Sequence, residues 1–178
     1  MKVVVLAGPE SSGKSALAAH LQRHFGARVL GEYVREFIDT QQRDTHYADI
    51  EAIAREQLAR EDAARAAQPP LLVLDTHLLS NILWSRVLFN DCPGWLEPAL
   101  LSRHYDLHLL LAPEGVPWIA DGQRCQPELG QRQAFYRACE QWLSGHRQPW
   151  IPLQGAWAQR AAAAITAVAQ LLSADQRI

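Results

Sequence analysis

A glycine-rich sequence close to the N-terminus constrains this chain more than any other feature. Residues 8–15 read Gly-Pro-Glu-Ser-Ser-Gly-Lys-Ser and match G-x-x-x-x-G-K-[ST], a loop whose backbone N–H groups surround phosphate groups. The apolar run Lys2–Ala7 before it predicts a short buried strand, and the pattern Ser15–Phe25 after it predicts a helix. This order places the positive N-terminal end of a helix at the phosphates. The N-terminal part of the chain therefore predicts a P-loop fold.

Lys14 in this loop is unusual for the composition of the chain. Of the 17 lysine and arginine residues, 15 are arginine, and the only other lysine is Lys2. A compact ammonium group fits among phosphate oxygens where a wide planar guanidinium group does not. In a P-loop the lysine reaches the β- and γ-phosphates, and the following hydroxyl, here Ser15, binds Mg²⁺. The motif therefore predicts ATP and Mg²⁺ as cofactors.

The composition predicts one soluble domain spanning residues 1–178. A net charge of −2 gives no reason to expect a nucleic-acid or anionic-membrane partner. The three cysteines, Cys92, Cys125 and Cys139, lack C-x-x-C spacing, which favours reduced thiols in the cytoplasm over a disulfide framework or a zinc site. Asp75 interrupts the best apolar stretch, so we expect no membrane insertion.

Strand and helix patterns alternate along the rest of the chain. Further strands are expected at residues 27–30, 71–75, 107–112 and 149–153, and helices at 48–67, up to about 103, and 156–172. This alternation predicts an α/β fold of the P-loop NTPase type, with a five-stranded, mostly parallel sheet and helices on both faces. Because ligands of such folds bind beyond the carboxyl ends of the strands, the residues just after each strand are the candidates for function.

Two carboxylates follow expected strands. Asp75 ends the apolar run Leu71–Leu74, as a Walker B aspartate does, and would hold Mg²⁺ or orient the acceptor hydroxyl. Glu32 follows the strand at residues 27–30 and would open on the same crevice, where it could accept sugar hydroxyls or a proton. For Glu32 the alternatives are a charge at a helix N-terminus or a salt bridge with Arg35.

Gln57 lies on the apolar stripe of the helix expected at 48–67, in line with Ile50 and Ile53. A polar amide on such a stripe needs a partner, which could be a ligand or the backbone. The same helix carries three i,i+4 charge pairs that we expect on a solvated face, namely Glu51/Arg55, Glu56/Arg60 and Glu61/Arg65.

A short lid is expected at about residues 117–132. The segment Pro117–Arg124 combines proline, glycine and arginine after the fourth strand, and Arg132 and Arg137 follow it. A phosphotransferase uses such a segment to exclude water and to stabilise charge on the transferring phosphoryl group. The alternative is an ordinary loop with solvated arginines.

These motifs together resemble the ribosylnicotinamide kinase domain of the bacterial NadR proteins. The resemblance is carried, in order, by the P-loop, Glu32–Glu36 with Gln57, Asp75–Thr76, Pro-Trp-x-x-Asp-Gly-x-Arg at 117–124, Arg132, and residues 155–160. It implies a P-loop kinase of nucleoside-kinase type that transfers the γ-phosphate of ATP to the 5′-hydroxyl of nicotinamide riboside and yields nicotinamide mononucleotide. It also implies a small-molecule nucleoside as the partner.

The resemblance assigns a role to each matching residue. ATP would contact Gly8, Glu10, Ser11, Ser12, Gly13, Lys14, Ser15 and Leu17, with Gly155, Trp157 and Arg160 near the adenine. The nucleoside would contact Glu32, Tyr33, Arg35, Gln57, Trp84, Trp118 and Asp121. The catalytic residues would be Lys14, Glu32, Asp75, Arg124 and Arg132, and the metal ligands Ser15 and Asp75.

The chain also departs from the family. His77 stands where a small polar or acidic residue is expected, and no His-x-Gly-His sequence occurs, so we expect no adenylyl transfer from this chain. Two alternatives stay open beside the riboside kinase. One is a kinase of the same architecture acting on another nucleoside or small alcohol, and the other is a regulatory ATP-binding module. The sequence predicts no oligomeric state.

Overall fold

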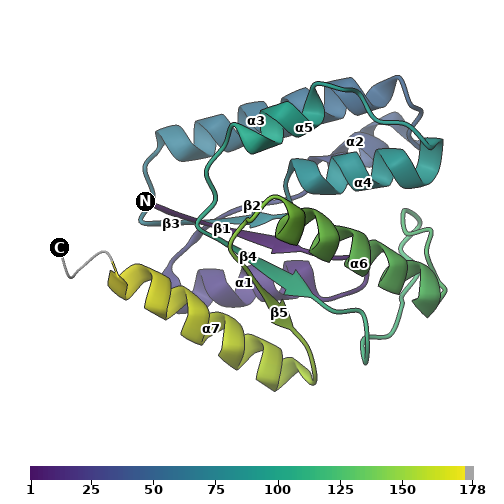
Figure 1. The fold of residues 1–178 in the computed structure, drawn as a ribbon. Helices are drawn as coiled ribbons and strands as arrows, with labels where there is room; N and C mark the ends of the chain where they lie inside the picture. The colour runs from purple at the N-terminus through teal and green to yellow at the C-terminus, as the bar shows by residue number, and fades with distance from the viewer. Residues whose placement is uncertain (175–178) are drawn as a thin grey trace.

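The first strand, β1 (Lys2–Ala7), lies at the centre of a five-stranded parallel sheet (Figure 1). In this computed structural model, which describes residues 1–174, the strand order is β2-β3-β1-β4-β5. The other strands are β2 (Arg28–Leu30), β3 (Leu71–Asp75), β4 (Leu107–Leu111) and β5 (Trp150–Leu153). A sheet covered on both faces explains why β1 and β3 are continuous apolar runs rather than alternating ones.

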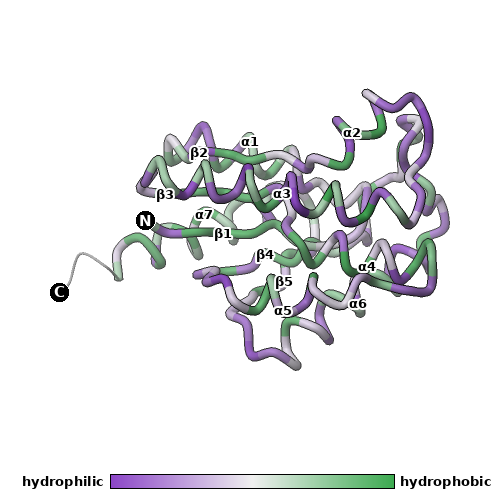
Figure 2. The backbone as a smooth tube through the Cα atoms, turned by 90° about the horizontal axis from the view of Figure 1, so that it is seen from above, coloured by the Kyte–Doolittle hydropathy of each residue, from purple (hydrophilic) through white to green (hydrophobic). Residues whose placement is uncertain are grey.

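The side chains of β1 alternate between two hydrophobic cores because successive residues of a strand point to opposite faces. Val3 and Val5 pack in one core, and Val4 and Leu6 pack in the other. Figure 2 shows β1 as a hydrophobic segment in the middle of the molecule. Every one of these four side chains is buried, so the strand is fixed from both sides.

Helices cover both faces of the sheet, as Figure 1 shows. One core is closed by α1 (Lys14–Phe25) and α7 (Trp157–Ala174). The other is closed by α3 (Asp49–Ala66), α4 (Leu78–Phe89), α5 (Leu96–Leu101) and α6 (Leu129–Gly145). The predicted P-loop NTPase fold is thus confirmed, with a sheet that is parallel throughout.

Two helices were not predicted from the sequence. Helix α2 (Tyr33–Gln41) follows Glu32 directly and has no fully buried residue, although its apolar residues Val34, Phe37 and Ile38 have helical spacing. Helix α6 begins at Leu129 and takes in Arg132, which therefore lies in a first helical turn rather than in the loop at 117–128. Both helices flank the predicted site.

The charged face expected on α3 is only partly solvated. All three i,i+4 pairs form, but Glu61 is 1% exposed, so the prediction of a solvated position is wrong there. Its carboxylate accepts hydrogen bonds from Arg65 at 2.8 Å and from the Tyr105 hydroxyl at 3.3 Å, and Arg103 lies 3.4 Å away. A buried carboxylate needs such partners because it has lost its hydration.

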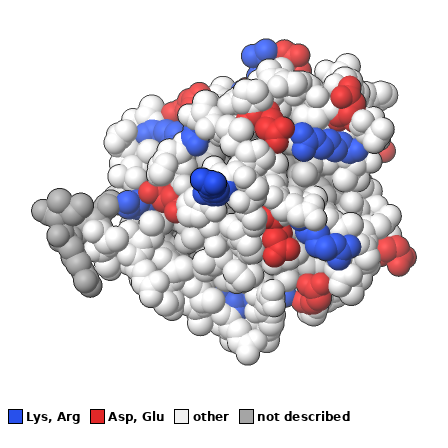
Figure 3. Space-filling view, viewed as in Figure 1, with Lys and Arg blue, Asp and Glu red and all other residues white. Residues whose placement is uncertain are grey.

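The surface carries charges of both signs. On the face shown in Figure 3, basic and acidic side chains are interspersed over the molecule.

Along residues 1–174, no helix has the combination of length and apolar character that crossing a bilayer requires.

Candidate functional site

The P-loop between β1 and α1 needs its two glycines. Gly8 has φ +128°, and a Cβ there would lie 2.5 Å from the carbonyl oxygen of Leu111 on β4. Gly13 has φ +94° and caps α1, a conformation that disfavours other residues. The Ser12 hydroxyl donates to the carbonyl of Pro9 at 2.9 Å, which closes the loop on itself. The chain can therefore curl around a phosphate only with glycine at both positions.

Lys14 extends over this loop. Its Nζ donates hydrogen bonds to the carbonyl oxygens of Gly8 at 3.0 Å and Pro9 at 2.7 Å. The ammonium group is thus held at the mouth of the loop, where a phosphate oxygen can replace a carbonyl as acceptor. Ser15, the predicted metal ligand, follows as an exposed residue in the first turn of α1.

Glu32 and Asp75 follow neighbouring strands, as predicted. Asp75 ends β3, which pairs with β1 and separates it from β2, and its side chain is largely buried. Glu32 accepts a hydrogen bond from the Ser80 hydroxyl at 3.3 Å and lies 3.5 Å from Nε of Arg35, so the predicted salt bridge is also present. Burial raises the pKa of Glu32, the charge of Lys14 opposes this, and the charge of Asp75 adds to it. The net effect is a raised pKa.

A cavity of about 370 Å³ opens beside the P-loop. Glu10, Lys14 and Glu32 line its polar side, and Trp84 lies among its apolar residues. The other lining residues are Val34, Arg35, Ile38, Asp44, Thr45, Ile50, Ile53, Ser80, Asn81, Leu88, Phe89, Gln123 and Cys125. The volume suits a small ligand such as a nucleoside. Sequence reasoning missed Ser80 and Asn81, although their place in the first turn after the Walker B residue could have indicated them.

Asp121 organises the loop that was predicted as a lid. Its Oδ1 accepts the backbone N–H groups of Gln123 at 3.1 Å and Arg124 at 3.0 Å, and its Oδ2 accepts Nη1 of Arg35 at 2.8 Å. Arg124 turns its own Nη1 to the carbonyl of Ile119 at 2.7 Å. The loop is therefore folded on itself and tied to α2 beside the cavity.

Trp118 and Glu10 contact each other directly, and their predicted contacts with the nucleoside and ATP stay predictions. The indole Nε1 of Trp118 donates to the Glu10 carboxylate at 2.7 Å. The same carboxylate accepts the backbone N–H groups of Cys125 at 3.2 Å and Gln126 at 2.7 Å. The sequence analysis placed Glu10 at ATP and Trp118 at the nucleoside, so this contact was not predicted.

Two of the predicted arginines are buried against backbone carbonyls. Arg132 donates through Nη1 to the carbonyl of Val116 at 3.2 Å, at the start of the loop. Arg160 is only 2% exposed. Its guanidinium group donates to the carbonyls of Ser12, Ala112, Glu114 and Gly155. Arg160 thus joins the P-loop, the end of β4 and the start of α7, and its predicted contact with adenine stays a prediction.

Gln57 hydrogen-bonds to the backbone, which was one of the two kinds of partner considered from the sequence. Its Oε1 accepts the N–H of Tyr33 at 2.9 Å, which satisfies a donor in the first turn of α2. Its Nε2 is buried without a hydrogen-bond partner among residues 1–174. The guanidinium group of Arg60 lies over the ring of Tyr33, with 4.3 Å between its Cζ and the ring centroid. Gln57 therefore supports the helix that follows Glu32.

Trp157 lies on the other side of the P-loop, where adenine was predicted. Its side chain is 45% exposed, and a Cβ on Gly13 would lie 4.0 Å from its ring. His20 packs edge-on against it, with 5.9 Å between the ring centroids. Gly155, with φ +83°, forms the turn before α7. An exposed indole beside the loop offers a flat apolar surface to a ring.

His77 belongs to the core rather than to the cavity. Its Nε2 lies 3.2 Å from Nε2 of His108, and its ring packs edge-on against Tyr105. Burial and the neighbouring His108 hold the pKa of His77 well below its usual value. The departure from the family at this position is therefore accommodated beneath the site by a neutral imidazole.

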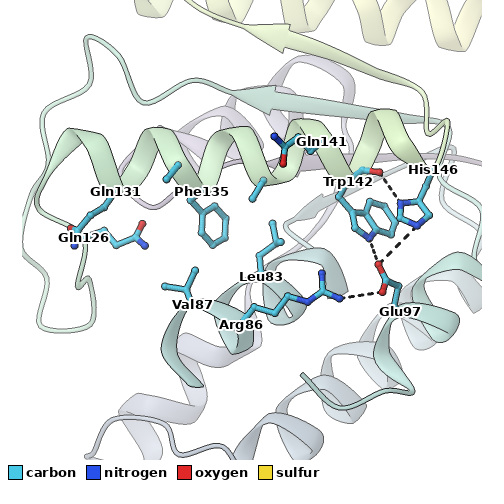
Figure 4. A pocket seen from close by; sticks show the side chains of 12 residues that line it. Leu83, Arg86, Val87, Glu97, Gln126, Gln131, Phe135, Gln141, Trp142 and His146 are labelled. Atoms are coloured by element: carbon cyan, nitrogen blue, oxygen red, sulfur yellow. Dashed lines mark hydrogen bonds and ion pairs between the residues drawn. The ribbon is translucent and has the colours of Figure 1, made fainter. Parts of the chain in front are cut away.

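A second, larger hollow of about 810 Å³ lies between α4 and α6 (Figure 4). Leu83 and Phe135 form its apolar floor, and Glu97 closes one end by accepting Nε1 of Trp142 at 2.6 Å and Nη2 of Arg86 at 3.1 Å. None of the catalytic, cofactor or substrate residues predicted from the sequence is among the residues that line this hollow, whereas Glu10, Lys14, Glu32, Arg35 and Trp84 line the smaller cavity. Leu17, predicted at ATP, is fully buried in the core.

The comparisons with known proteins agree with this architecture. The trifunctional NAD biosynthesis/regulator protein NadR of Salmonella typhimurium is 25% identical over 139 residues, and that of Escherichia coli is 24% identical. The matches cover 76% of this chain and 34% of each relative, so the chain spans about a third of their length. The resemblance to NadR proteins expected from the motifs is thereby confirmed.

Solved structures share the fold at low identity. A crystal structure of NadR protein in complex with NR superposes with a TM-score of 0.81 at 22% identity, over 97% of this chain and 52% of that one. A deoxyadenosine kinase from M. mycoides with bound dATP reaches 0.62 at 11% identity, over 94% and 99%. The family described as AAA domain matches residues 3–160. The chain therefore belongs to the AAA domain family of P-loop proteins.

Proposed function

We propose that this chain is an ATP-dependent kinase that phosphorylates nicotinamide riboside at the 5′-hydroxyl and yields nicotinamide mononucleotide. The observation that carries the proposal is that Lys14 of the P-loop and the strand-end carboxylate Glu32 line one cavity of nucleoside size. A phosphoryl donor site and an acceptor site are thus adjacent, as transfer between two bound substrates requires. The similarity to NadR proteins supports nicotinamide riboside as the acceptor.

In the proposed reaction the P-loop binds the phosphate groups of ATP. The backbone N–H groups from Gly8 to Ser15 and the N-terminus of α1 bind the phosphates, and Lys14 stabilises charge on the transferring group. Ser15 and Asp75 would hold Mg²⁺, which would neutralise the negative charge of the phosphates. Residues 1–174 contain no cluster of three or more His, Cys, Asp or Glu side chains suited to a metal. This fits Mg²⁺, which uses one or two carboxylates together with substrate phosphates.

Glu32 and the residues around it bind the acceptor nucleoside. Its carboxylate accepts a hydrogen bond from a sugar hydroxyl and takes up the proton as the phosphoryl group arrives. The raised pKa of Glu32 makes the carboxylate a stronger base than an exposed glutamate. Trp84 offers an aromatic face in the same cavity, which suits a flat cationic nicotinamide ring.

The loop at 117–128 acts as the lid over this cavity. Gln123 and Cys125 already lie among the cavity residues, so the loop screens the site from water. Arg124 is the residue of the loop that would stabilise charge on the phosphoryl group after leaving its partners Asp121 and Ile119. Arg132 supports the start of the loop through Val116.

A panel of acceptors tests this function. ADP release is measured with ATP and Mg²⁺ in the presence of nicotinamide riboside, deoxyadenosine, free ribose or no acceptor. The proposal expects release that depends on nicotinamide riboside. Release driven best by another nucleoside would assign the chain to a different nucleoside kinase, and slow release that ignores every acceptor would assign it to a regulatory ATP-binding module.

A further inference from the structure

One carboxylate of the P-loop holds three groups of the lid. Oε1 of Glu10 accepts Nε1 of Trp118 and the backbone N–H of Gln126, each at 2.7 Å. Oε2 accepts the backbone N–H of Cys125 at 3.2 Å. Glu10 is 8% exposed, so these bonds are formed away from water. Residues more than 100 positions apart in the sequence are thereby joined at one side chain.

Gln123 of the lid also donates to the carbonyl of Arg35 at 3.3 Å in a partly buried position, and two further contacts of the lid are exposed. Arg35 pairs with Asp121, and Gln123 donates to Asp39 at 2.6 Å, both at the surface of α2. Exposed pairs of this kind are weakened by solvent and salt. Hydrogen bonds to a buried carboxylate are stronger, because the charge assists them and water does not compete. The attachment at Glu10 is therefore expected to hold the lid more strongly than the two exposed contacts do.

The chemistry of the contact selects glutamate. All three partners are N–H donors, so the side chain between them must offer two acceptor oxygens and no donor. Glutamine would place an NH₂ group against one of these donors. Position 10 is one of the freely varying positions of the P-loop pattern, so the motif itself does not require a carboxylate there.

We propose that Glu10 is a positioning residue that fastens the lid to the P-loop, with the Trp118 indole as its principal lid partner. Arg124 immediately precedes Cys125, so the bond from Glu10 to the Cys125 N–H fixes where the lid arginine begins. The state of the phosphate loop and the place of the lid are thus coupled through one side chain. The consequence for turnover rests on the proposed kinase function, whereas the attachment itself does not.

The attachment is tested first without ATP or any acceptor. Hydrogen–deuterium exchange reports the amides of Cys125 and Gln126, and trypsin cleavage after Arg124 reports opening of the lid. Trp118→Phe keeps an aromatic ring and removes only the indole donor, and Glu10→Gln removes the second acceptor oxygen. Each is expected to raise both rates about tenfold, because a hydrogen bond to a charged group is lost. Circular dichroism checks that each variant is folded.

Matched controls separate this effect from general loosening. Trp95→Phe removes an indole N–H that has no hydrogen-bond partner among residues 1–174, and Glu140→Gln changes a half-buried glutamate on α6, outside the lid. Both should leave the two lid rates within about twofold of the parent. The effect of the double variant Glu10→Gln/Trp118→Phe should be smaller than the product of the two single effects, because both changes act on the hydrogen bonds of the same carboxylate.

Measurements of kcat and KM distinguish a positioning role of Glu10 and Trp118 from a purely structural one. If the kinase function holds, Trp118→Phe lowers kcat about tenfold and leaves the KM for ATP within about twofold, because the lid positions charge for the transition state. Unchanged exchange and cleavage in both single variants, or equal increases in the controls, would overturn the proposal. Since these rates need no substrate, the attachment and the kinase function can fail independently.

Discussion

Lys14 and Glu32 line one cavity, and the ammonium group of the first lowers the pKa that burial raises at the second. Lys14 begins α1 directly after the P-loop that follows β1, whereas Glu32 comes from the loop after β2, with β3 between the two strands. The sheet therefore brings a phosphate-binding cation and a hydroxyl-binding carboxylate to the same edge.

Lys14→Ala should lower kcat by about 10²-fold or more, because its charge acts chiefly on the transferring phosphoryl group. Lys14→Arg should not restore the rate, since the planar guanidinium group does not fit the loop. Steady-state kinetics measure both variants, with the exposed Arg23→Ala on α1 as a matched control. A folded Lys14→Ala protein with full activity would remove Lys14 from the mechanism.

Glu32→Gln and Asp75→Asn should separate the two strand-end carboxylates. Asp75 follows β3 beside the P-loop, so its amide variant should raise the Mg²⁺ requirement. Glu32 follows the outer strand β2, so Glu32→Gln should weaken riboside binding and turnover while ATP·Mg²⁺ binding stays nearly intact. Calorimetry of each ligand on each variant measures this. Loss of ATP·Mg²⁺ affinity with retention of the riboside in Glu32→Gln would reverse the two assignments.

Glu32→Gln should also change the pH dependence of stability. The folded protein raises the pKa of Glu32, so folding binds its proton more tightly than the unfolded chain does. The stability that this supplies is fully present below the unfolded pKa and is lost as pH rises through the folded pKa. The glutamine variant should therefore gain unfolding free energy relative to the parent from acid to neutral pH, as urea titrations measure. An unchanged difference across that range would contradict the raised pKa.

The buried imidazoles predict loss of stability in acid. Burial lowers the pKa of His108 to about 4, and that of His77 is held well below its usual value by burial, His108 and the charge of Arg65. Stability from these groups is present above the unfolded pKa of about 6.5 and is lost as pH falls towards the folded values. Each contributes a slope of up to about 1.4 kcal/mol per pH unit.

Urea titrations between pH 7 and pH 4 measure that slope. Replacing His77 with glutamine should flatten it, because one buried titrating group is removed while a polar side chain remains. The exposed His24→Gln on α1 serves as the control and should leave the slope of the parent. Equal slopes for the parent and His77→Gln would show that the buried pair does not resist protonation.

The elements with strong local patterns were predictable from the sequence. The bounds of β1 and β3 were predicted to the residue, because a short, continuous apolar run is typical of a central strand in a parallel sheet. Helix α2 was missed although Val34, Phe37 and Ile38 have helical spacing, because the segment is short and places no fully buried residue in the core.

The roles of single polar side chains were less predictable because their partners lie far away in the sequence. The Glu10 carboxylate meets Trp118, 108 positions later, and no spacing rule connects them. Glu61 is read as solvated from its i,i+4 partner Arg65, yet Tyr105 covers it. Such contacts depend on how the loops pack after the sheet has formed.

Product analysis tests the central claim most directly. The protein is incubated with ATP, Mg²⁺ and nicotinamide riboside, and chromatography with phosphorus NMR follows ADP and the phosphorylated riboside. The account predicts nicotinamide mononucleotide, phosphorylated at the 5′-oxygen, in equal amounts with ADP, and loss of both products in Lys14→Ala. ADP formed at the same rate without the riboside, with no mononucleotide in the mixture, would contradict it.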